Sequence, residues 1–455
     1  MQVRKPHVRR SNLFKVANRT LPLLWRSNLL PSPELLEEDL VERAMRQTGL
    51  RDFGDPWFRK PLRTLMEAVR QEANLNPVGR MVAYVHMLKL LKERLKAEHW
   101  FAAFPEIRER PLPAPIVVVG PMRSGTTRLH RLLAADMRFS HLRLFEAMCP
   151  VPPGPSRAKA YVRRRKDKRH KFAARTLKTL HLANPDTAAI HPTDPFAPEE
   201  ELGLLVPTAW GMKHEAQWRI PGYGRWCEQQ DATPAYQMMA DLLRLTSWFR
   251  GDPSGRPWIL KTPQHTLDLK ALLTVFPDAK LIFIHRDPAA VVGSSCSLVW
   301  NQMLVQSDEV DPRWIGREWL RKTSVKLERM DHVRATMPEA QMLDVSFEEM
   351  DRDWLSEMRR IYAFLGMDMA PAQQAMQDYL NLYEQESSLQ PHRYRLADFG
   401  LEADAVREQL VDDPAMFADD PETHYAFVPP EPLQPLTSLA TASSSPLTKP
   451  LSRLS

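Results

Sequence analysis

The sequence is poor in cysteine and has no long uninterrupted apolar stretch. Only three cysteines occur among its 455 residues, far apart and without a Cys-x-x-Cys pair: Cys149, Cys227 and Cys296. Such a sparse, odd-numbered set argues against both a disulfide framework and a zinc site. No apolar run approaches the ~18 residues that a membrane-spanning helix needs. The short apolar stretch from Leu21 to Trp25 is also too short for the core of a signal peptide.

The excess of positive charge is modest, with 62 Lys and Arg against 56 Asp and Glu and a formal net charge of +6. This balance suits a protein with an anionic cofactor and does not by itself indicate nucleic acid. A dense basic run from Arg157 to Lys178 predicts a helix, which we interpret as a solvated face. A docking surface for an acidic acceptor or membrane headgroups is the alternative. No aromatic residue interleaves the core of the run, so stacking on single-stranded nucleic acid is poorly supported.

A strand, a glycine-containing loop and a helix follow one another between residues 115 and 133. Ile116–Val119 is a short, β-branched apolar run, which is typical of a buried parallel strand. The run breaks at Gly120, and a helical spacing of leucines then begins, at Leu129, Leu132 and Leu133. In this geometry loop N–H groups and a helix N-terminus converge on one point, where they favour an anion. The stretch therefore predicts a phosphate-binding loop.

The loop departs from the pattern of nucleotide triphosphatases, G-x-x-x-x-G-K-[ST], at one position. Gly120 and Gly125 have the required spacing, but Thr126 stands in place of the lysine and is followed by Thr127. Arg123, inside the loop, supplies a nearby cation instead. Because the lysine and a metal ion together neutralise the β- and γ-phosphates, its loss argues against ATP or GTP hydrolysis. No paired acidic residues at a strand end resemble a magnesium site, so we expect no metal.

The segment Gly120-Pro-Met-Arg-Ser-Gly-Thr-Thr127 resembles the 5′-phosphosulfate loop of the sulfotransferase superfamily. That family transfers a sulfuryl group from 3′-phosphoadenosine 5′-phosphosulfate (PAPS) and releases 3′-phosphoadenosine 5′-phosphate (PAP). The resemblance implies that the donor is bound by the loop residues Arg123, Ser124, Gly125, Thr126 and Thr127. The alternative for this stretch alone is an ordinary strand–helix turn without a ligand.

A second stretch, Lys280-Leu-Ile-Phe-Ile-His-Arg-Asp-Pro288, strengthens the resemblance. It reads as another buried strand, followed by a helix that begins near Pro288. Arg286 lies at the end of the strand, and Ser294 comes eight residues later, in the helix. In the resembled family an arginine and a serine at these places bind the 3′-phosphate of PAPS, which ATP lacks. A guanidinium and a hydroxyl can both make charge-assisted hydrogen bonds to phosphate. A surface turn stabilised by an Arg–Asp pair is the alternative.

A third strand end, Trp258-Ile-Leu-Lys-Thr-Pro-Gln-His265, places Lys261 and His265 near the two motifs. The resemblance implies that Lys261 contacts the bridging oxygen of the donor. His265 follows the lysine by four residues, whereas the catalytic histidine of the small-molecule branch follows it by two. His265 is therefore a candidate base, and a structural histidine at a helix N-terminus is the alternative.

Glu146 is the preferred candidate for the general base. His141–Glu146 predicts a second short parallel strand, and ligands of open α/β sheets gather at the carboxyl ends of strands. The position after the loop helix also matches the carboxylate base of the tyrosyl-protein and heparan branches of the resembled family. The alternative is a carboxylate that pairs with a neighbouring arginine.

The expected fold is α/β and P-loop-like, with a central parallel sheet, helices on both faces and a helical N-terminal extension. We expect a mostly helical extension at residues 1–110, with helices at 33–47, 60–73 and 77–97. The α/β domain would span 111–428, with a further strand at 341–345. The Pro- and Ser-rich tail at 429–455 predicts disorder.

The expected function is PAPS-dependent transfer of a sulfuryl group to a hydroxyl or amine by in-line displacement. A small molecule, a glycan or a lipid can be the acceptor, and a homo-oligomer remains open. Since Golgi members of the family carry a membrane anchor that this sequence lacks, we expect a cytoplasmic protein that binds no nucleic acid. The alternatives are a catalytically silent nucleotide-binding module of the same fold and a P-loop kinase.

Overall fold

A computed structural model describes residues 12–153, 167–183, 193–387 and 394–410 of the chain. These residues all fall within one compact unit, Met1–Asp412. The tail at 429–455, for which disorder is predicted, lies outside the described residues. Within the described ranges, no helix combines the length and the apolar character needed to cross a membrane.

The elements before and around the first strand are α1 (Asn12–Arg26), α2 (Glu37–Thr48), η1 (Pro56–Phe58), α3 (Arg59–Gln71), α4 (Pro77–Ala103), α5 (Glu106–Glu109), β1 (Ile116–Val119), α6 (Thr126–Ala134) and α7 (Leu144–Met148). The middle of the chain forms α9 (Arg169–Ala183), α11 (Leu202–Leu205), η2 (Val206–Thr208), α12 (Lys213–Gln217), α13 (Pro221–Cys227), α14 (Thr233–Arg250), β2 (Ile259–Lys261) and α15 (Leu269–Val275). The remainder forms β3 (Lys280–His285), α16 (Pro288–Gln306), α17 (Pro312–Arg334), η3 (Glu339–Gln341), β4 (Met342–Ser346), α18 (Phe347–Arg352), α19 (Trp354–Leu365), α20 (Ala370–Ser387), η4 (Leu396–Phe399) and α21 (Ala403–Leu410).

The described strands form one parallel sheet in the order β2-β1-β3-β4. Its register pairs Ile116 of β1 with Ile259 of β2 and with Lys280 of β3. The predicted central parallel sheet is therefore confirmed. Because β1 lies in the middle, the loop that follows it opens at the carboxyl end of the sheet with a neighbouring strand on each side.

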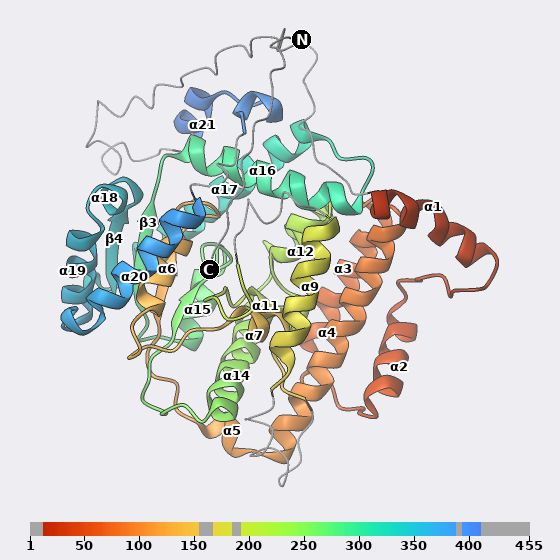
Figure 1. The fold of residues 1–455 in the computed structure, drawn as a ribbon, viewed down its shortest axis with the longest axis horizontal. Coiled ribbons are helices and arrows are strands. Elements are labelled where there is room, and N and C mark those ends of the chain that lie inside the picture. The colour runs from red at the N-terminus through yellow and green to blue at the C-terminus, as the bar shows by residue number, and fades with distance from the viewer. Residues whose placement is uncertain (1–11, 154–166, 184–192, 388–393, 411–455) are drawn as a thin grey trace, which may run out of the picture. The chain divides into compact units, whose positions relative to one another are not determined.

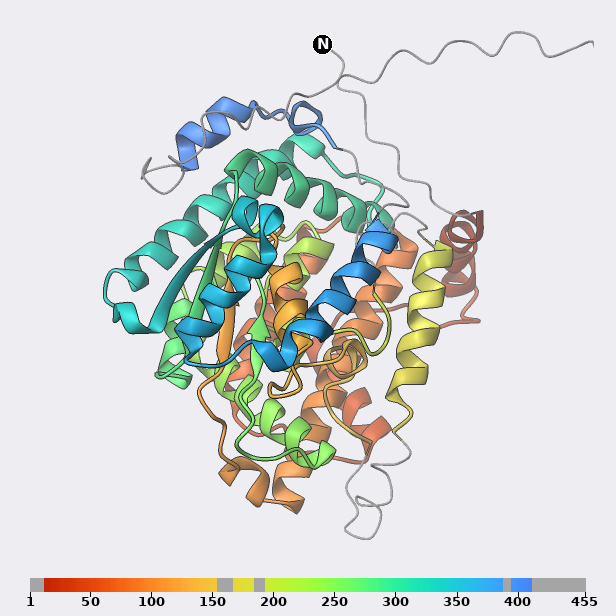
Figure 2. The same ribbon diagram turned by 60° about the vertical axis from the view of Figure 1, so that its left-hand side comes forward.

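Helices cover both faces of the sheet, as the sequence predicts (Figure 1). Side chains alternate along a strand, and in β1 Val117 and Val119 enter one hydrophobic cluster while Ile116 and Val118 enter another. The first cluster extends into α2, α3, α4 and α14, and the second into α6, α19 and α20. Figure 2 shows α20 beside α6 on the second face.

The N-terminal helices form close to the predicted ranges and share the core of the sheet. The α4 helix begins at Pro77, and the side chain of Asn76 caps it by accepting a hydrogen bond of 2.8 Å from the Gly79 N–H. Leu40 of α2, Leu62 of α3 and Leu91 of α4 are fully buried in the same cluster as β1. These helices are therefore a layer of the α/β core.

The predicted strand at 141–146 is wrong, because residues 144–148 form the short helix α7. Just before the segment, Ser140 makes an isolated parallel bridge with Trp258, ahead of β2. The Glu146 carboxylate then accepts a hydrogen bond of 3.0 Å from the Arg143 N–H, which is the reciprocal half of a capping box. This local bond turns the chain into a helix where the alternating pattern predicted extension.

The predicted basic helix at 157–178 is described only from Arg169 onward, as part of α9. Arg169 is buried, pairs with Asp167 and donates a 2.8 Å hydrogen bond to the Cys149 carbonyl. This cation belongs to the interior and not to a solvated face.

Candidate active site

The loop after β1 is shaped to leave the start of α6 open to a ligand. Gly125 precedes α6 with a φ of 94°, in the left-handed region that favours glycine. A Cβ at this position would also collide with the ring of Phe347. No side chain of the described residues caps α6. In its first turn the Arg128 N–H donates a hydrogen bond to the Gly125 carbonyl, so the N–H groups of Thr126 and Thr127 are the ones that the start of a helix leaves without an intrahelical partner. An anion placed there would be stabilised by these donors and by the helix dipole.

Arg123, Arg286 and Ser294 come together on one side of the loop. The Arg123 Nε donates a hydrogen bond of 3.0 Å to the Ser294 Oγ, and Arg286 Nη1 donates one of 2.9 Å to the Arg123 carbonyl. Arg123 adopts a φ of 73°, an uncommon conformation for a residue other than glycine. Arg123 thus meets two residues that lie more than 160 positions later in the chain. The resulting pair of guanidinium groups and one hydroxyl is a ready phosphate-binding set.

Two aromatic side chains hold this cluster in place. Phe347, the first residue of α18, lies under the Arg286 guanidinium at 4.1 Å from its ring centre. Tyr394 donates a hydrogen bond of 3.0 Å to the Ala290 carbonyl, and its ring lies where a side chain on Gly293 would go. Burial raises the pKa of Tyr394, so its hydroxyl stays protonated and available as a donor.

Lys261, at the end of β2, reaches the start of α6 from the opposite strand. Its ammonium lies 3.1 Å from the Thr127 Oγ1 and 2.5 Å from the Glu200 Oε1. The lysine side chain is buried, whereas 19% of the Glu200 side chain is exposed. A buried cation beside the loop can stabilise negative charge on a leaving group, and the partly exposed carboxylate is accessible to an acceptor.

A buried hydrogen-bonded chain supports Lys261 from behind. Glu201 accepts a 3.1 Å hydrogen bond from the Lys261 N–H, and its other oxygen lies 2.5 Å from the His265 Nε2. The His265 Nδ1 lies 2.9 Å from the Tyr236 hydroxyl. His265 is fully buried, with both ring nitrogens engaged. This arrangement corresponds to the structural alternative for His265, because no ring nitrogen remains to receive a proton from an acceptor.

Glu146 also lacks the geometry of a base. It is fully buried, and its carboxylate pairs with Arg143 at 2.6 Å and with Arg250. Burial alone would raise the pKa of Glu146, but the charge and hydrogen bonds of Arg250, together with Arg143, lower it to about 2. A carboxylate that is ion-paired with two arginines in this way is a poor proton acceptor at neutral pH. The structure therefore supports the alternative interpretation of Glu146, a carboxylate that pairs with neighbouring arginines.

Glu200 and Glu201 were missed as site residues in the sequence. The stretch Pro198-Glu-Glu-Glu-Leu reads as the start of a helix, and α11 does begin at Leu202. Three consecutive carboxylates between the two donor motifs were the available signal. What the sequence did not show is that this segment runs against β2, about 60 residues later in the chain, and delivers both carboxylates to Lys261.

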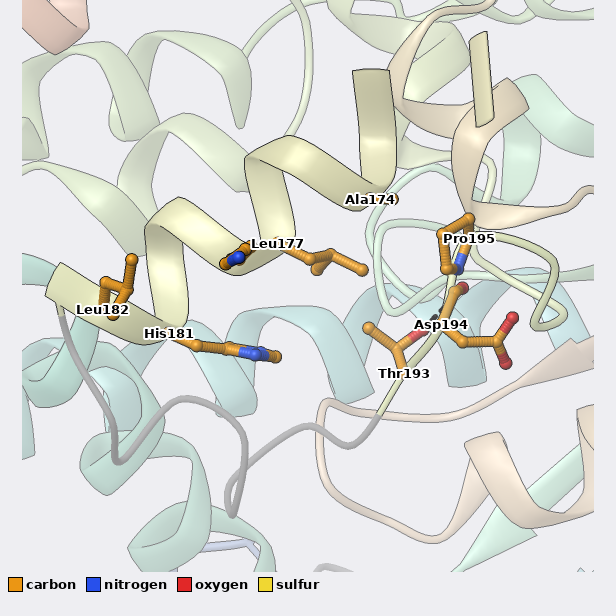
Figure 3. Close-up of a pocket in the computed structure, with 8 residues that line it drawn as sticks. Ala174, Leu177, His181, Leu182, Thr193, Asp194 and Pro195 are labelled. Carbon is orange, nitrogen blue, oxygen red and sulfur yellow. Dashed lines mark hydrogen bonds between the residues drawn. The ribbon is translucent and has the colours of Figure 1, made fainter. Parts of the chain in front are cut away.

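A cavity of about 440 Å³ lies between α9 and residues 193–195 (Figure 3). In this view Leu177 and His181 extend from α9 toward Thr193. No lining residue belongs to the donor loop, so the cavity is separate from the phosphate-binding cluster. Pro195 in its wall precedes Glu200 by five residues, which places the cavity along the segment that carries the Glu200 carboxylate.

The fold and these clusters define a class of protein: a P-loop-like α/β protein with cationic groups gathered beside its loop and no lysine at the end of that loop. Among the described residues, no group of three or more His, Cys, Asp or Glu side chains could hold a metal ion. The sequence model of the Sulfotransferase family matches residues 115–371. Because this match covers more than half of the chain, the protein belongs to the sulfotransferase family.

Individual relatives agree with this assignment. The chain is 26% identical over 281 residues to omega-hydroxy-beta-dihydromenaquinone-9 sulfotransferase Stf3 of Mycobacterium bovis, over 56% of this chain and 63% of the relative. The same figures hold for Stf3 of Mycobacterium tuberculosis. The match therefore spans less than two thirds of these relatives.

Solved structures show the same fold. The crystal structure of sulfotransferase STF1 from Mycobacterium tuberculosis H37Rv is 28% identical and superposes with a TM-score of 0.71, over 82% of this chain and 98% of that one. Sulfotransferase STF9 from Mycobacterium avium also gives a TM-score of 0.71, at 24% identity, over 85% of this chain and 96% of that one.

Proposed function

We propose that the protein is a sulfotransferase that uses PAPS as its donor and a hydroxyl or amine compound as its acceptor. The observation that carries this proposal is the presence of two cationic clusters, one beside Arg123 and one beside Thr127. A nucleotide with phosphate groups at both the 3′ and the 5′ positions would engage both clusters, whereas ATP would leave the first one without an anion.

The residues present fit such a donor. Ser124, Gly125, Thr126 and Thr127 would surround the 5′-phosphosulfate at the uncapped start of α6. Arg286 and Ser294 would hold the 3′-phosphate. Arg123 is bonded to Ser294, so its cation would serve the 3′ side as well as the loop. When bound, the donor supplies a sulfuryl group attached to a phosphate leaving group.

Lys261 would stabilise the charge that develops as the sulfuryl group leaves the phosphate. The acceptor oxygen forms a bond to sulfur while the bond between sulfur and the bridging oxygen breaks, and negative charge collects on that oxygen. The Lys261 ammonium, beside Thr127, and the N–H groups at the start of α6 are the donors nearest to this position. Fixed donors in a buried site need no reorganisation as the charge grows.

Glu200 is our choice for the general base, in place of Glu146 and His265. Its carboxylate is partly exposed and lies 2.5 Å from the Lys261 ammonium, so it can meet an acceptor on the side of the sulfuryl group that faces away from the phosphate. It would take the acceptor's proton as the new bond to sulfur forms. Glu201, His265 and Tyr236 would position Lys261 through its backbone.

The acceptor is proposed only by class. The relative Stf3 is named for omega-hydroxy-beta-dihydromenaquinone-9, which supports a small-molecule or lipid hydroxyl as the acceptor here, with a glycan as the alternative. The 440 Å³ cavity beside α9 offers room along the segment that leads to Glu200.

The test combines donor affinity with group transfer. Calorimetry should show that PAP binds at least about ten-fold more tightly than 5′-AMP, because only PAP offers a 3′-phosphate to Arg286 and Ser294. Radiolabelled PAPS should then transfer its sulfuryl group to a phenol, sugar or hydroxylated lipid in an acceptor panel. Equal affinity for PAP and 5′-AMP would overturn the donor assignment. Tight PAP binding without transfer to any acceptor would favour the silent module, and magnesium-dependent ATP turnover would favour the kinase.

A further inference from the structure

A second, smaller cavity is lined in part by Gly203, Val206 and Pro207, which follow the carboxylates of the site in the chain. Its volume is about 40 Å³, and it is enclosed by α4, the end of α7, the α11–η2 segment and α12. The cationic residues in its wall are Lys89 on α4 and Lys213 on α12. Lys213 is close enough to Glu199 and Glu200 to interact electrostatically with both. The wall of the cavity therefore contributes a lysine within electrostatic reach of the carboxylate that we assign as the base.

Polar groups around this cavity lack partners. Within the described part of the chain, Lys213 makes no hydrogen bond or ion pair, and the His86 Nε2 in the cavity wall is buried without a partner. Both ring nitrogens of His214, which is fully buried and packs edge-on against His86 at 5.1 Å, are also unsatisfied. Buried polar groups are nearly always hydrogen-bonded in folded proteins. Several unpaired groups around one cavity indicate a polar ligand.

The charges around the cavity favour an anionic ligand. Burial and the nearby cation of Lys89 lower the pKa of Lys213 to about 8, against the attraction of Glu199 and Glu200. The Glu200 carboxylate is already bonded to Lys261. Glu93, the carboxylate in the cavity wall, is bound by Lys96 at 3.0 Å and by the Val151 N–H at 3.1 Å. Two like charges therefore line the cavity, while the carboxylate in its wall is engaged by other groups.

The volume of the cavity limits the size of the ligand group that it can hold. A cavity of about 40 Å³ has room for about three water-sized groups. That space accommodates a carboxylate but not an aromatic or sugar ring. The rest of an acceptor would have to lie outside the cavity, toward Glu200.

We propose that Lys89 and Lys213 form a subsite for a carboxylate on the acceptor, whose hydroxyl is thereby directed at Glu200. The proposal rests on the proposed function for its acceptor and adds a charge requirement to it. Lys213, which makes no hydrogen bond or ion pair with the residues that the structure describes, makes the main contact. Lys89, which is held by the Met148 carbonyl at 2.5 Å, supplies the second charge.

The test compares two phenols that differ by one carboxylate group, 4-hydroxyphenylacetate and 4-methylphenol, by calorimetry with the full chain. We expect the carboxylate compound to bind at least about ten-fold more tightly, both with and without saturating PAP. Lys213→Met should abolish this preference, and Lys89→Met should weaken it. Lys213→Arg keeps the charge and should retain most of it.

Lys92→Met is the matched control. Lys92 lies three residues beyond Lys89 on α4 but bonds to Gln47 of α2, away from the cavity, so its loss should leave the preference unchanged. Equal affinity for the two phenols, no binding of either, or a preference that survives Lys213→Met would overturn the subsite. Failure to bind PAP alongside an intact, Lys213-dependent preference would overturn the donor assignment and still support the subsite.

Discussion

The Lys261 ammonium and the Glu200 carboxylate lie 2.5 Å apart, joining the end of β2 to a segment 61 residues earlier in the chain. The pair places a cation and a base candidate side by side at the start of α6. In the proposed transfer the lysine would stabilise the leaving oxygen and the carboxylate would receive the proton of the attacking group, so both would act on one sulfuryl group. The pair thereby also sets where an acceptor must enter.

Replacing Glu200 with Gln should lower kcat by a factor of ~10²–10⁴ while PAP affinity stays within a few-fold. The amide keeps the size and one hydrogen-bond acceptor but cannot accept a proton, and a positioned base typically contributes this much. Steady-state kinetics and PAP calorimetry on the same preparation measure both quantities. His265→Asn should cost less, since His265 acts only through Glu201 and the Lys261 backbone. Near-normal turnover of Glu200→Gln would show that another residue is the general base.

The strands and the loop could be predicted from the sequence, whereas the contacts of the candidate site residues could not. The strands at 116–119 and 280–285 were readable because buried, β-branched runs between prolines and glycines leave few other structures. The loop was readable because its chemistry is local. The ion pair of Glu146 could not be predicted, because its partner Arg250 is 104 residues away and no local pattern records that contact. The contact between Glu200 and Lys261 could not be predicted for the same reason.

Replacing Arg286 with Ala should weaken PAP binding about ten- to a hundred-fold. The change removes a charge-assisted contact worth ~1.5–3 kcal/mol and also the bond that fixes the Arg123 carbonyl. The affinity for 5′-AMP, which has no 3′-phosphate, serves as the internal control and should change little. A parallel loss of affinity for both nucleotides would place Arg286 outside the 3′-phosphate site.

ATP hydrolysis should be absent even with magnesium, and sulfuryl transfer should survive EDTA. Thr126 occupies the place where triphosphatases carry the lysine that neutralises the β- and γ-phosphates. Phosphate release from ATP and transfer of radiolabel from PAPS, each with and without EDTA, check the two halves. Magnesium-dependent phosphate release that disappears in Gly125→Val would contradict the assignment.

Glu146 should stabilise the fold at neutral pH and cease to do so in acid. Its pKa in the folded state, about 2, is depressed from 4.5, so the contribution is present above about pH 5 and is lost as the pH falls toward 2. The shift corresponds to about 3 kcal/mol. Glu146→Gln should cost about 3–5 kcal/mol at pH 7, because Arg250 and Arg143 lose their counter-ion. Urea unfolding at pH 7 and pH 3 measures the change, and an equal cost at both would contradict the ion-pair role.

Asp268 should give the opposite pH dependence. It is buried, and burial raises its pKa from 3.8 to about 6, despite hydrogen bonds from the Trp210 Nε1 at 2.8 Å and the Gln264 Nε2 at 2.7 Å. A raised folded-state pKa means that the neutral acid stabilises the fold below about pH 4, and this contribution disappears as the pH rises through about 6. Asp268→Asn keeps an oxygen for both donors and never ionises. Between pH 4 and pH 7 the free energy of unfolding of Asp268→Asn should therefore rise by roughly 3 kcal/mol relative to that of the wild type. Urea unfolding across this range checks the gain, with Glu146→Gln as a variant whose profile should shift only at lower pH. Parallel profiles for Asp268→Asn and the wild type would show that the buried carboxylate is already ionised at pH 4, held so by its two hydrogen bonds and the nearby charges of His265 and Lys326.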